Sequence, residues 1–561
     1  MSTGNRGRRI MVLLGVAALL ASLLAGPAIA RDGNGAANSQ EVQLQILAIN
    51  DFHGNINTFS SSFGGSGGAQ NLATNIRARE AEVRNSIVVS AGDLIGASPL
   101  ISALFHDEPT IEAMNLIGLD INGVGNHEFD EGPAELLRMA NGGSHPVDGD
   151  LDGDGFSGAD FDFLAANVVV DATGNTLFPS YTVRNYQGVR VAFIGLPLQG
   201  TPTIVTPSGV EGLTFNDEVE TVNAIIPHLQ KRNIEAFVVL LHEGGFSPGG
   251  QNDCNGGLTG PVADITRGLD EAVDLVIAGH TNDEFICQID GKWVTMADNA
   301  GRIFTDIDVT LNRVTKDMTV QHIENVNNLQ SAEDAPDLVD LIEKYDTLSA
   351  PLANAIIGTI TADITRTNNA AGESALGDVI ADAQLAATSS AGTGNAVIAF
   401  MNPGGIRDDL DFLGAGPDLD GEVTYGEAFS VQPFGNSLVT MTLTGNQIDT
   451  LLEQQFDNPD PGAMRVLQVS NGFTYTWDAS APTGAKVDIA SVALDGVPID
   501  PSATYRVTVN SFLADGGDNF TILREGTDRL GGEVDLDALV TYFGNNSPVA
   551  PGPQNRITVV P

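Results

Sequence analysis

Short runs of apolar residues alternate with longer amphipathic stretches along the first half of the chain. Apolar positions recur at helical spacing in two of those stretches, Gln70–Arg84 and Asn216–Arg232. Strands that alternate with helices predict a layered α/β domain with buried strands. The strand-like runs are Val42–Ile49 and residues 86–92, 121–125, 190–196, 236–241 and 274–279.

A second region follows one further amphipathic stretch. Apolar residues at helical spacing from Asp334 to Leu352 predict an interdomain helix, to which we assign residues 331–352. A chain of 561 residues is too long for one hydrophobic core, so a second domain is expected. Residues 353–561 predict a smaller α+β domain, with strand-like runs at residues 395–401, 437–445 and 504–512.

The first thirty residues have the pattern of a secretory signal. Three arginines precede the apolar stretch Ile10–Leu24, and the sequence Ala28-Ile29-Ala30 follows it. A basic region, a short apolar region and an A-x-A site predict a signal peptide over residues 1–30, cleaved after Ala30. We therefore expect a secreted or periplasmic mature protein without a membrane span.

The net charge of the chain limits the classes of ligand that it is expected to bind. A formal net charge of −46 at pH 7 argues against binding of nucleic-acid polymers, because a protein that binds them needs a basic surface. Small phosphate ligands are still compatible with it where metal ions supply positive charge locally. The two cysteines, Cys254 and Cys287, predict one disulfide in an exported protein, with two free thiols as the alternative.

Metal-capable side chains follow five of the strand-like runs. In parallel sheets, ligands bind outside the carboxyl ends of the strands, so we expect these side chains to converge. Carboxylate, imidazole and amide groups suit ions such as Zn²⁺ and Mn²⁺, and the set is large enough for two ions that share a carboxylate. The residues are Asp51 and His53, Asp93, Asn126, His127 and Asp130, His242, and His280 and Asn282.

These motifs resemble those of a known family. D-x-H, G-D, G-N-H-E-x-D, a lone His after an apolar strand, and G-H-x-N occur in the order found in calcineurin-like metallophosphoesterases. The chain is most similar to the secreted 5′-nucleotidase/UDP-sugar hydrolase family, whose C-terminal domain resembles the segments 402–409, 431–436 and 510–520. The resemblance implies a four-layered α/β/β/α metallophosphoesterase domain over residues 42–330, then a smaller α+β substrate-binding domain.

The resemblance also implies roles for the strand-end residues. Relatives vary at the position of Asn282, so its contact with the first metal stays open. His127 would face the phosphoryl group or its leaving oxygen, with Asp130 orienting the ring. The implied metal ligands are Asp51 and His53 for the first ion, Asn126, His242 and His280 for the second, and Asp93 as the bridge.

Substrate recognition would come from the second domain. By resemblance, Phe434 and Phe512 would stack on the two faces of a nucleobase, and Asp518 would accept hydrogen bonds from ribose hydroxyls. Arg407 would lie near the phosphate and Asn402 near the base edge. From the residues alone, two core phenylalanines and a structural salt bridge of Arg407 are the favoured interpretation.

An acidic loop at residues 148–162 has no place in this scheme. Asp148, Asp150, Asp152 and Asp154 have the spacing of a calcium loop, but Ala159 occupies the twelfth position where a bidentate Glu is expected. A calcium site and a solvated acidic loop are therefore both compatible with the sequence.

Together these patterns predict a secreted two-metal phosphohydrolase acting on nucleoside 5′-monophosphates. Two alternatives keep the chemistry but change the substrate, to 2′,3′-cyclic nucleotides with 3′-nucleotides or to UDP-sugars. A third alternative is a nucleotide-binding or surface protein that kept the fold without activity. The presence of Asp93, His127 and His242 disfavours that third alternative.

Overall fold

A computed structural model describes residues 40–57, 59–60, 65–205, 207–330, 335–414, 418–458 and 462–561. The expected signal peptide, residues 1–30, lies outside these described residues. Within them, no helix has the length and apolar character needed to cross a membrane.

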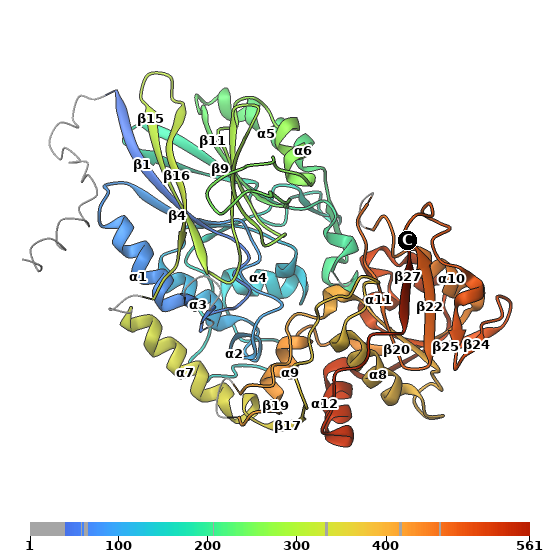
Figure 1. The fold of residues 1–561 in the computed structure, drawn as a ribbon. Helices are drawn as coiled ribbons and strands as arrows, with labels where there is room; N and C mark the ends of the chain where they lie inside the picture. Colours follow the sequence, from blue (N-terminus) through green and yellow to red (C-terminus); the bar gives the residue numbers. More distant parts are fainter. Residues whose placement is uncertain are drawn as a thin grey trace, which may run out of the picture.

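The N-terminal domain is built on two six-stranded sheets (Figure 1). In the first sheet the strand order is β16 (Met318–Asn327), β15 (Ile303–Asn312), β1 (Glu41–Ile49), β4 (Ser86–Ser90), β5 (Ile121–Gly123) and β6 (Asp162–Leu164). In the second it is β13 (Glu284–Ile289), β14 (Lys292–Ala297), β12 (Leu275–Ala278), β11 (Ala236–His242), β9 (Val189–Pro197) and β8 (Tyr181–Tyr186).

The two sheets pack face to face, and helices cover their outer faces. Ile46 and Val89 of the first sheet share a buried core with Phe193 and Val238 of the second. Separate cores join each sheet to its helices. The expected four layers are therefore confirmed, with α1 (Ala69–Glu80), α3 (Glu108–Ile117) and α4 (Pro133–Asn141) on one side and α5 (Glu218–Gln230) and α6 (Pro261–Gly268) on the other.

Parallel pairing directs the carboxyl ends of the central strands to common edges. β1 pairs in parallel with β4, and β4 with β5; β9, β11 and β12 are parallel in the second sheet. The sheets approach closely at Gly123 in β5, where an added Cβ would lie 2.7 Å from the Cβ of Leu240 in β11. The loops that follow strands of both sheets therefore meet in one place.

The helices largely follow the expected ranges. α5 begins after Asp217, whose carboxylate accepts the backbone N–H of Glu220 and satisfies one free donor of the first turn. α1 ends at Glu80, four residues before the expected end, because the chain must turn before it enters β4. The side chains on either side of that turn are joined by a hydrogen bond from the Ser86 hydroxyl to Glu80.

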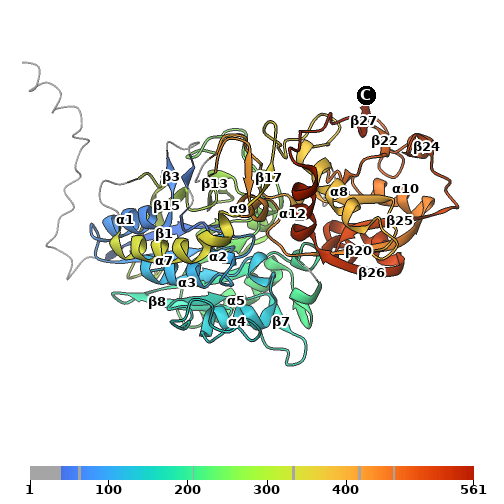
Figure 2. The same cartoon turned by 90° about the horizontal axis from the view of Figure 1, so that it is seen from below.

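A helix, α7 (Pro336–Ala353), lies in the region where the interdomain helix is expected; residues 331–334 of the expected range lie outside the described residues. It packs against α1, α3 and the short helix α2 (Leu100–Ala103), and Figures 1 and 2 show it along the helical face of the N-terminal domain. Arg77 of α1 donates to both carboxylate oxygens of Asp337, at 2.9 and 2.6 Å. α7 also contacts α9 (Tyr425–Val431) of the following domain.

The C-terminal domain contains two larger sheets and several helices. The five-stranded sheet has the order β21 (Gln468–Val469), β18 (Ile398–Met401), β25 (Thr504–Asn510), β20 (Ser437–Thr444) and β26 (Thr527–Val534). The four-stranded sheet has the order β24 (Val497–Pro498), β23 (Ala493–Leu494), β22 (Phe473–Asp478) and β27 (Ile557–Val560). β17 (Ile356–Thr359) pairs with β19 (Glu422–Thr424), and the helices include α8 (Ala375–Thr388), α10 (Gly445–Glu453), α11 (Ser511–Ala514) and α12 (Asp535–Asn546).

Candidate metal centre and substrate pocket

The strand-end residues adopt an unusual backbone conformation. Left-handed φ values are unfavourable for residues other than glycine and cluster at functional sites. Such values, between 47° and 79°, occur at Asp51, His53, Asp93, His280 and Asn282. The backbone therefore bends sharply after several strands and turns these side chains toward one another.

Asp93 lies at the centre of the cluster. Its Oδ2 is 3.0 Å from Nε2 of His242 and 3.8 Å from Nε2 of His53, while its Oδ1 accepts the backbone N–H of His127. Two groups of candidate ligands, each with ligand atoms within 4.8 Å of one another, have Asp93 in common: His53, Asp93 and His127, and Asp93, His242 and His280. One carboxylate is thus placed where it could be shared by two ions.

Backbone carbonyls orient two of the histidines. The Nδ1 atoms of His53 and His242 lie 2.9 Å from the carbonyl oxygen of Gly96 and 2.7 Å from that of Ala91. Because a carbonyl can only accept, each Nδ1 carries a proton, and each Nε2, which faces Asp93, is the nitrogen left for an ion. This is the arrangement that prepares an imidazole to bind a metal ion.

Burial sets the charge of the cluster. It lowers the pKa of both His53 and His280 to about 3, so these rings are neutral and ready to coordinate. It raises the pKa of Asp51 to about 7. For Asp93, burial favours the neutral acid, but His242, His127 and His53 outweigh it and hold its pKa well below the usual range.

The donor set fits divalent ions. Asp93 raises the pKa of His242 to about 10 against the effect of burial, so positive charge is stabilised at this place. Among the described residues, Oδ1 of Asn282 is buried without a hydrogen-bond partner. At Gly125 an added Cβ would clash with Asp93 and His242, so glycine keeps the centre open.

The remaining expected ligands lie around this centre. Oδ1 of Asn126 is 3.2 Å from Nε2 of His242. Asp51 lies outside both groups of close ligand atoms: its Oδ1 is 3.9 Å from Nε2 of His53, and its two oxygens accept the N–H of His280 at 3.0 and 2.9 Å. The structure thus brings Asp51, His53, Asp93, Asn126, His242 and His280 into one region, with His127 as near to Asp93 as a ligand would be.

The pair of His127 and Asp130 has the expected geometry. Nδ1 of His127 lies 2.7 Å from Oδ2 of Asp130. Burial lowers the pKa of His127, but the charges of Asp130 and Asp93 outweigh it, so the net shift is upward. The ring can therefore carry a proton toward the pocket while Asp130 fixes its orientation.

Sequence reasoning missed Glu128, the residue that fastens the Asp93 loop. Its buried carboxylate accepts the backbone N–H groups of Asp93 and Leu94, both at 3.0 Å, and that of Gly125 at 2.8 Å. The signal was present, since Glu128 is the E of the G-N-H-E-x-D motif. Its role becomes visible only when the two loops are side by side.

A cavity of about 180 Å³ lies between the two domains beside this centre. The ring of Phe434 stacks on that of His127, with centroids 5.7 Å apart, and the guanidinium of Arg407 lies 5.8 Å from the centre of the Phe434 ring. The lining includes Asn126, His127, Asp130 and His280 of the first domain, and Asn402, Arg407, Phe434, Arg465, Phe512 and Asp518 of the second.

Asp518 is the centre of a polar network in this cavity. Its two oxygens accept hydrogen bonds from Asn402, at 2.9 Å, and from Arg465, at 2.7 Å. Asn510 in turn donates to Asn402. Sequence reasoning missed Arg465, which brings a positive charge to the pocket. Arg366, which the sequence left without a role, donates to the carbonyl of Ile406, next to Arg407.

Two family profiles match the two domains of the chain. The profile "Calcineurin-like phosphoesterase" covers residues 44–283, and the profile "5'-nucleotidase, C-terminal domain" covers residues 356–525. The cell wall protein Lmo0130 of Listeria monocytogenes is 32% identical over 537 residues, which are 90% of this chain and 68% of that protein. The chain belongs to the 5′-nucleotidase family of metallophosphoesterases. A calcineurin-like phosphoesterase domain is therefore followed in this chain by a 5′-nucleotidase C-terminal domain.

Other members of the family extend the comparison. Endonuclease YhcR of Bacillus subtilis is 34% identical over 536 residues, which are 93% of this chain but 41% of that protein. This chain thus spans less than half the length of YhcR. The crystal structure of the 5′-nucleotidase precursor from Thermus thermophilus matches with a TM-score of 0.74 and 26% identity, covering 92% of this chain and 99% of that one.

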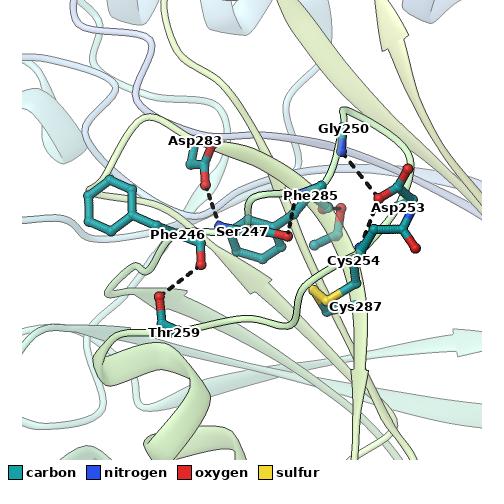
Figure 3. The surroundings of a disulfide bond; sticks show 12 residues. Phe246, Ser247, Gly250, Asp253, Cys254, Thr259, Asp283, Phe285 and Cys287 are labelled. Atoms are coloured by element: carbon teal, nitrogen blue, oxygen red, sulfur yellow. Dashed lines mark hydrogen bonds between the residues drawn. A yellow bond between two sulfur atoms is a disulfide. The ribbon is translucent and has the colours of Figure 1, made fainter.

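The expected disulfide is confirmed in this member of the 5′-nucleotidase family. Cys254, in the long loop after His242, is bonded to Cys287 in β13 (Figure 3). The same loop is held by a hydrogen bond from the backbone N–H of Ser247 to Asp283, at 2.8 Å. The bridge therefore joins the loop after one metal-facing strand to the strand that follows His280 and Asn282.

The acidic loop is arranged differently from the calcium loop that its spacing resembles. Nζ of Lys344, from α7, lies 2.6 Å from Asp152 and 2.9 Å from Asp154. Asp150 accepts the backbone N–H of Gly153, and Asp148 lies 3.0 Å from Nε2 of His106. The four carboxylates thus have partners within the protein, one of which, Lys344, is shared by Asp152 and Asp154, and calcium binding stays a prediction.

Proposed function

We propose that this chain is a secreted dinuclear-metal phosphohydrolase that releases phosphate from nucleoside 5′-monophosphates. The observation that carries the proposal is the cavity between the domains. Two phenylalanines and an acid of the C-terminal domain line it together with His127 and His280 of the metal centre. A nucleotide could place its base in one domain and its phosphorus in the other.

The metal ligands are proposed as the family resemblance implies. Asp51 and His53 would hold one ion, Asn126, His242 and His280 the other, and Asp93 both, with Asn282 as a further oxygen donor for the first. Zn²⁺ or Mn²⁺ suits this mixture of nitrogen and oxygen ligands. When bound, two such ions polarise phosphoryl oxygens and generate a nucleophile from water at neutral pH.

The chain's own residues provide the rest of the chemistry. A protonated His127 would stabilise the negative charge that develops on the phosphoryl group or its leaving oxygen. Asp130 would keep the ring oriented for this task, since their hydrogen bond fixes which nitrogen faces the pocket. The guanidinium of Arg407 is proposed to neutralise the phosphate from the C-terminal side.

Recognition of the nucleoside is assigned to the C-terminal domain. The base would lie between Phe434 and Phe512, and Asn402 would meet its edge. Asp518 would accept from ribose hydroxyls, although it is already paired with Arg465. A bound ribose must therefore either share the Asp518 carboxylate with Arg465 or displace the Arg465 guanidinium from it.

Three observations support an extracellular location. The first thirty residues have the pattern of an export signal. The relative Lmo0130 is described as a cell wall protein. The Cys254–Cys287 disulfide is of a kind that persists in oxidising compartments.

A phosphate-release panel tests the proposal. The purified protein is stripped with a chelator, reloaded with Mn²⁺, Zn²⁺ or Co²⁺, and assayed on AMP, UMP, UDP-glucose, 3′-AMP, 2′,3′-cyclic AMP and ATP. We expect AMP and UMP to be the best substrates and activity to return only with metal. Preference for 2′,3′-cyclic AMP or UDP-glucose would transfer the assignment to the corresponding alternative, and no turnover with any ion would favour a binding protein.

A further inference from the structure

A second group of metal-capable side chains lies outside the metal centre. His106 and His145 stack with ring centroids 3.7 Å apart and an interplanar angle of 17°. Nδ1 of His106 is 2.8 Å from Glu131, and Nε2 of His106 is 3.0 Å from Asp148. Nδ1 of His145 is 3.3 Å from the same Asp148 oxygen. Two imidazoles and two carboxylates thus meet within one small volume.

Three separate segments build this group. His106 follows α2 in a left-handed conformation, with φ of 52°, and the next residue, Asp107, is anchored by Ser102 and by the N–H of Gly96. Glu131 follows Asp130 after the short 3₁₀ turn at His127–Phe129. The unfavourable φ of His106 directs its ring away from the helix and toward the other two segments.

The third segment is the acidic loop. The backbones of His145 and Gly149 exchange hydrogen bonds at 3.1 and 3.0 Å, which closes a tight turn. Within that turn the N–H of Asp148 donates to Nδ1 of His145 at 3.1 Å. This bond orients the ring of His145 within the turn, and an ion bound through Nδ1 would take the place of the Asp148 N–H.

We propose that His106, His145 and Glu131, with Asp148 beside them, form a binding site for a transition-metal ion of the Zn²⁺ type. His106, His145 and Glu131 each offer a ligand atom within 4.8 Å of the others, which is the span of ligands around a single ion. Two imidazole nitrogens with carboxylate oxygens are a typical Zn²⁺ ligand set. The harder ions Ca²⁺ and Mg²⁺ prefer oxygen ligands alone.

Exposure of the four side chains agrees with entry of an ion from solvent. The two imidazoles are largely covered, with 18% and 13% of their side-chain surface exposed, whereas the two carboxylates are about half exposed, at 48% and 47%. In the absence of an ion, a protonated His106 would pair with both carboxylates. Binding would release that proton to solvent and replace its charge with that of the metal.

The site is close to the catalytic residues without belonging to them. A cavity of about 110 Å³ is lined on one side by His106 and Glu131 and on the other by His127 and Asp130. An ion at Glu131 would fix the residue that directly follows Asp130. It would also fasten the acidic loop to the end of α2, a function that the D-x-D-x-D spacing alone does not indicate.

The experiment measures Zn²⁺ content after equilibration with excess Zn²⁺ and gel filtration, by mass spectrometry, in the full-length protein. The variants are His145→Ala and Glu131→Gln. The matched control is His322→Ala, which removes another histidine beside an acid, since Nε2 of His322 is 3.7 Å from Glu324. We expect both variants to lose about one equivalent of Zn²⁺ per chain and the control to lose none.

Thermal unfolding with and without Zn²⁺ gives a second readout of the same proposal. Zn²⁺ should raise the Tm of wild type and of His322→Ala more than that of His145→Ala or Glu131→Gln. An ion that binds only the folded state stabilises it, and this stabilisation is lost with the site. Glu131→Gln keeps shape and volume at a half-exposed position, so loss of metal in that variant cannot be attributed to misfolding. Equal Zn²⁺ content in wild type and Glu131→Gln would overturn the proposal.

Discussion

The two edges of the central sheets both carry acids, fully buried at one edge and partly buried at the other, and these acids have opposite surroundings. At the carboxyl edge, Asp51 and Asp93 follow their strands and face histidines. At the other edge, Asp120 and Asp274 precede β5 and β12 and accept the backbone N–H groups of Val88 and Phe237 in neighbouring strands, at 3.0 and 2.9 Å. Burial raises the pKa of both Asp120 and Asp274.

The difference shows that the groups that face a carboxyl group decide whether it is ionised. At the other edge, burial and the neighbouring carboxyl group of Asp317 outweigh the backbone hydrogen bond from Phe237 and raise the pKa of Asp274 to about 8. At the carboxyl edge, imidazoles from three other loops hold the pKa of Asp93 low, and the second domain closes the site. Burial alone therefore does not identify a functional acid; the charge that faces it does.

The largest expected effect comes from Asp93→Asn. The change preserves shape but removes the charge proposed to be shared by two ions. We expect kcat to fall by about 10³-fold or more, since ion-based charge stabilisation contributes several kcal/mol. Bound metal, measured by mass spectrometry, should fall as well. A variant with two tightly held ions and normal turnover would contradict the site assignment.

Asp274→Asn is the matched control at the opposite edge of the second sheet. Its effect on turnover should be negligible, because no catalytic group contacts it and an amide oxygen can still accept the N–H of Phe237. Comparable losses of kcat in the Asp93 and Asp274 variants would show that acids at the two edges do not differ in function.

His127→Ala should have the next largest effect. The ring is proposed to act on the transition state, so kcat should fall by about 10²–10⁴-fold while metal content is retained. Metal analysis beside steady-state kinetics separates the two roles. Because His127 lies as near to Asp93 as a ligand would, loss of one ion in this variant would make it a ligand instead.

Phe512→Ala should weaken nucleotide use more moderately. Loss of base stacking costs about 1–3 kcal/mol, or roughly 5- to 150-fold in kcat/KM for AMP. A small aryl phosphate that does not reach Phe512 should be hydrolysed almost normally. Phe434→Ala is a less selective test, because the Phe434 ring also stacks on His127. If Phe512→Ala lowered kcat/KM equally for AMP and for the aryl phosphate, the base would be recognised by other residues.

The smallest effect concerns stability and pH. The carboxyl group of Asp274 has a pKa of about 8 in the folded chain and 3.8 as its ordinary value, so its contribution to stability is present below pH 3.8 and is lost as pH rises through 8. Asp274→Asn should remove a slope of at most about 1.4 kcal/mol per pH unit between pH 5 and 8. Urea unfolding at several pH values measures it; an unchanged slope would mean that Asp274 is ionised in the folded protein.

Local patterns predicted the features that depend on neighbours in the chain. The strand ends could be found because each metal-capable residue comes within a few positions of an apolar run. Glu128 and Arg465 could not, since they act on partners 35 and 53 residues away, Asp93 and Asp518. The partner of the acidic loop could not be predicted for the same reason, because the ammonium of Lys344, which contacts Asp152, lies on a helix 192 residues further along the chain.

The Cys254–Cys287 bond has a consequence for resistance to proteolysis. It closes a covalent ring of chain that contains His280 and Asn282. The glycine-rich stretch Asn255–Gly257 lies inside this ring and is exposed, which is typical of sites where proteases cut. A cut there would leave both new ends attached through sulfur. The enzyme could thus lose a peptide bond in this loop without losing the segment that carries part of its metal centre.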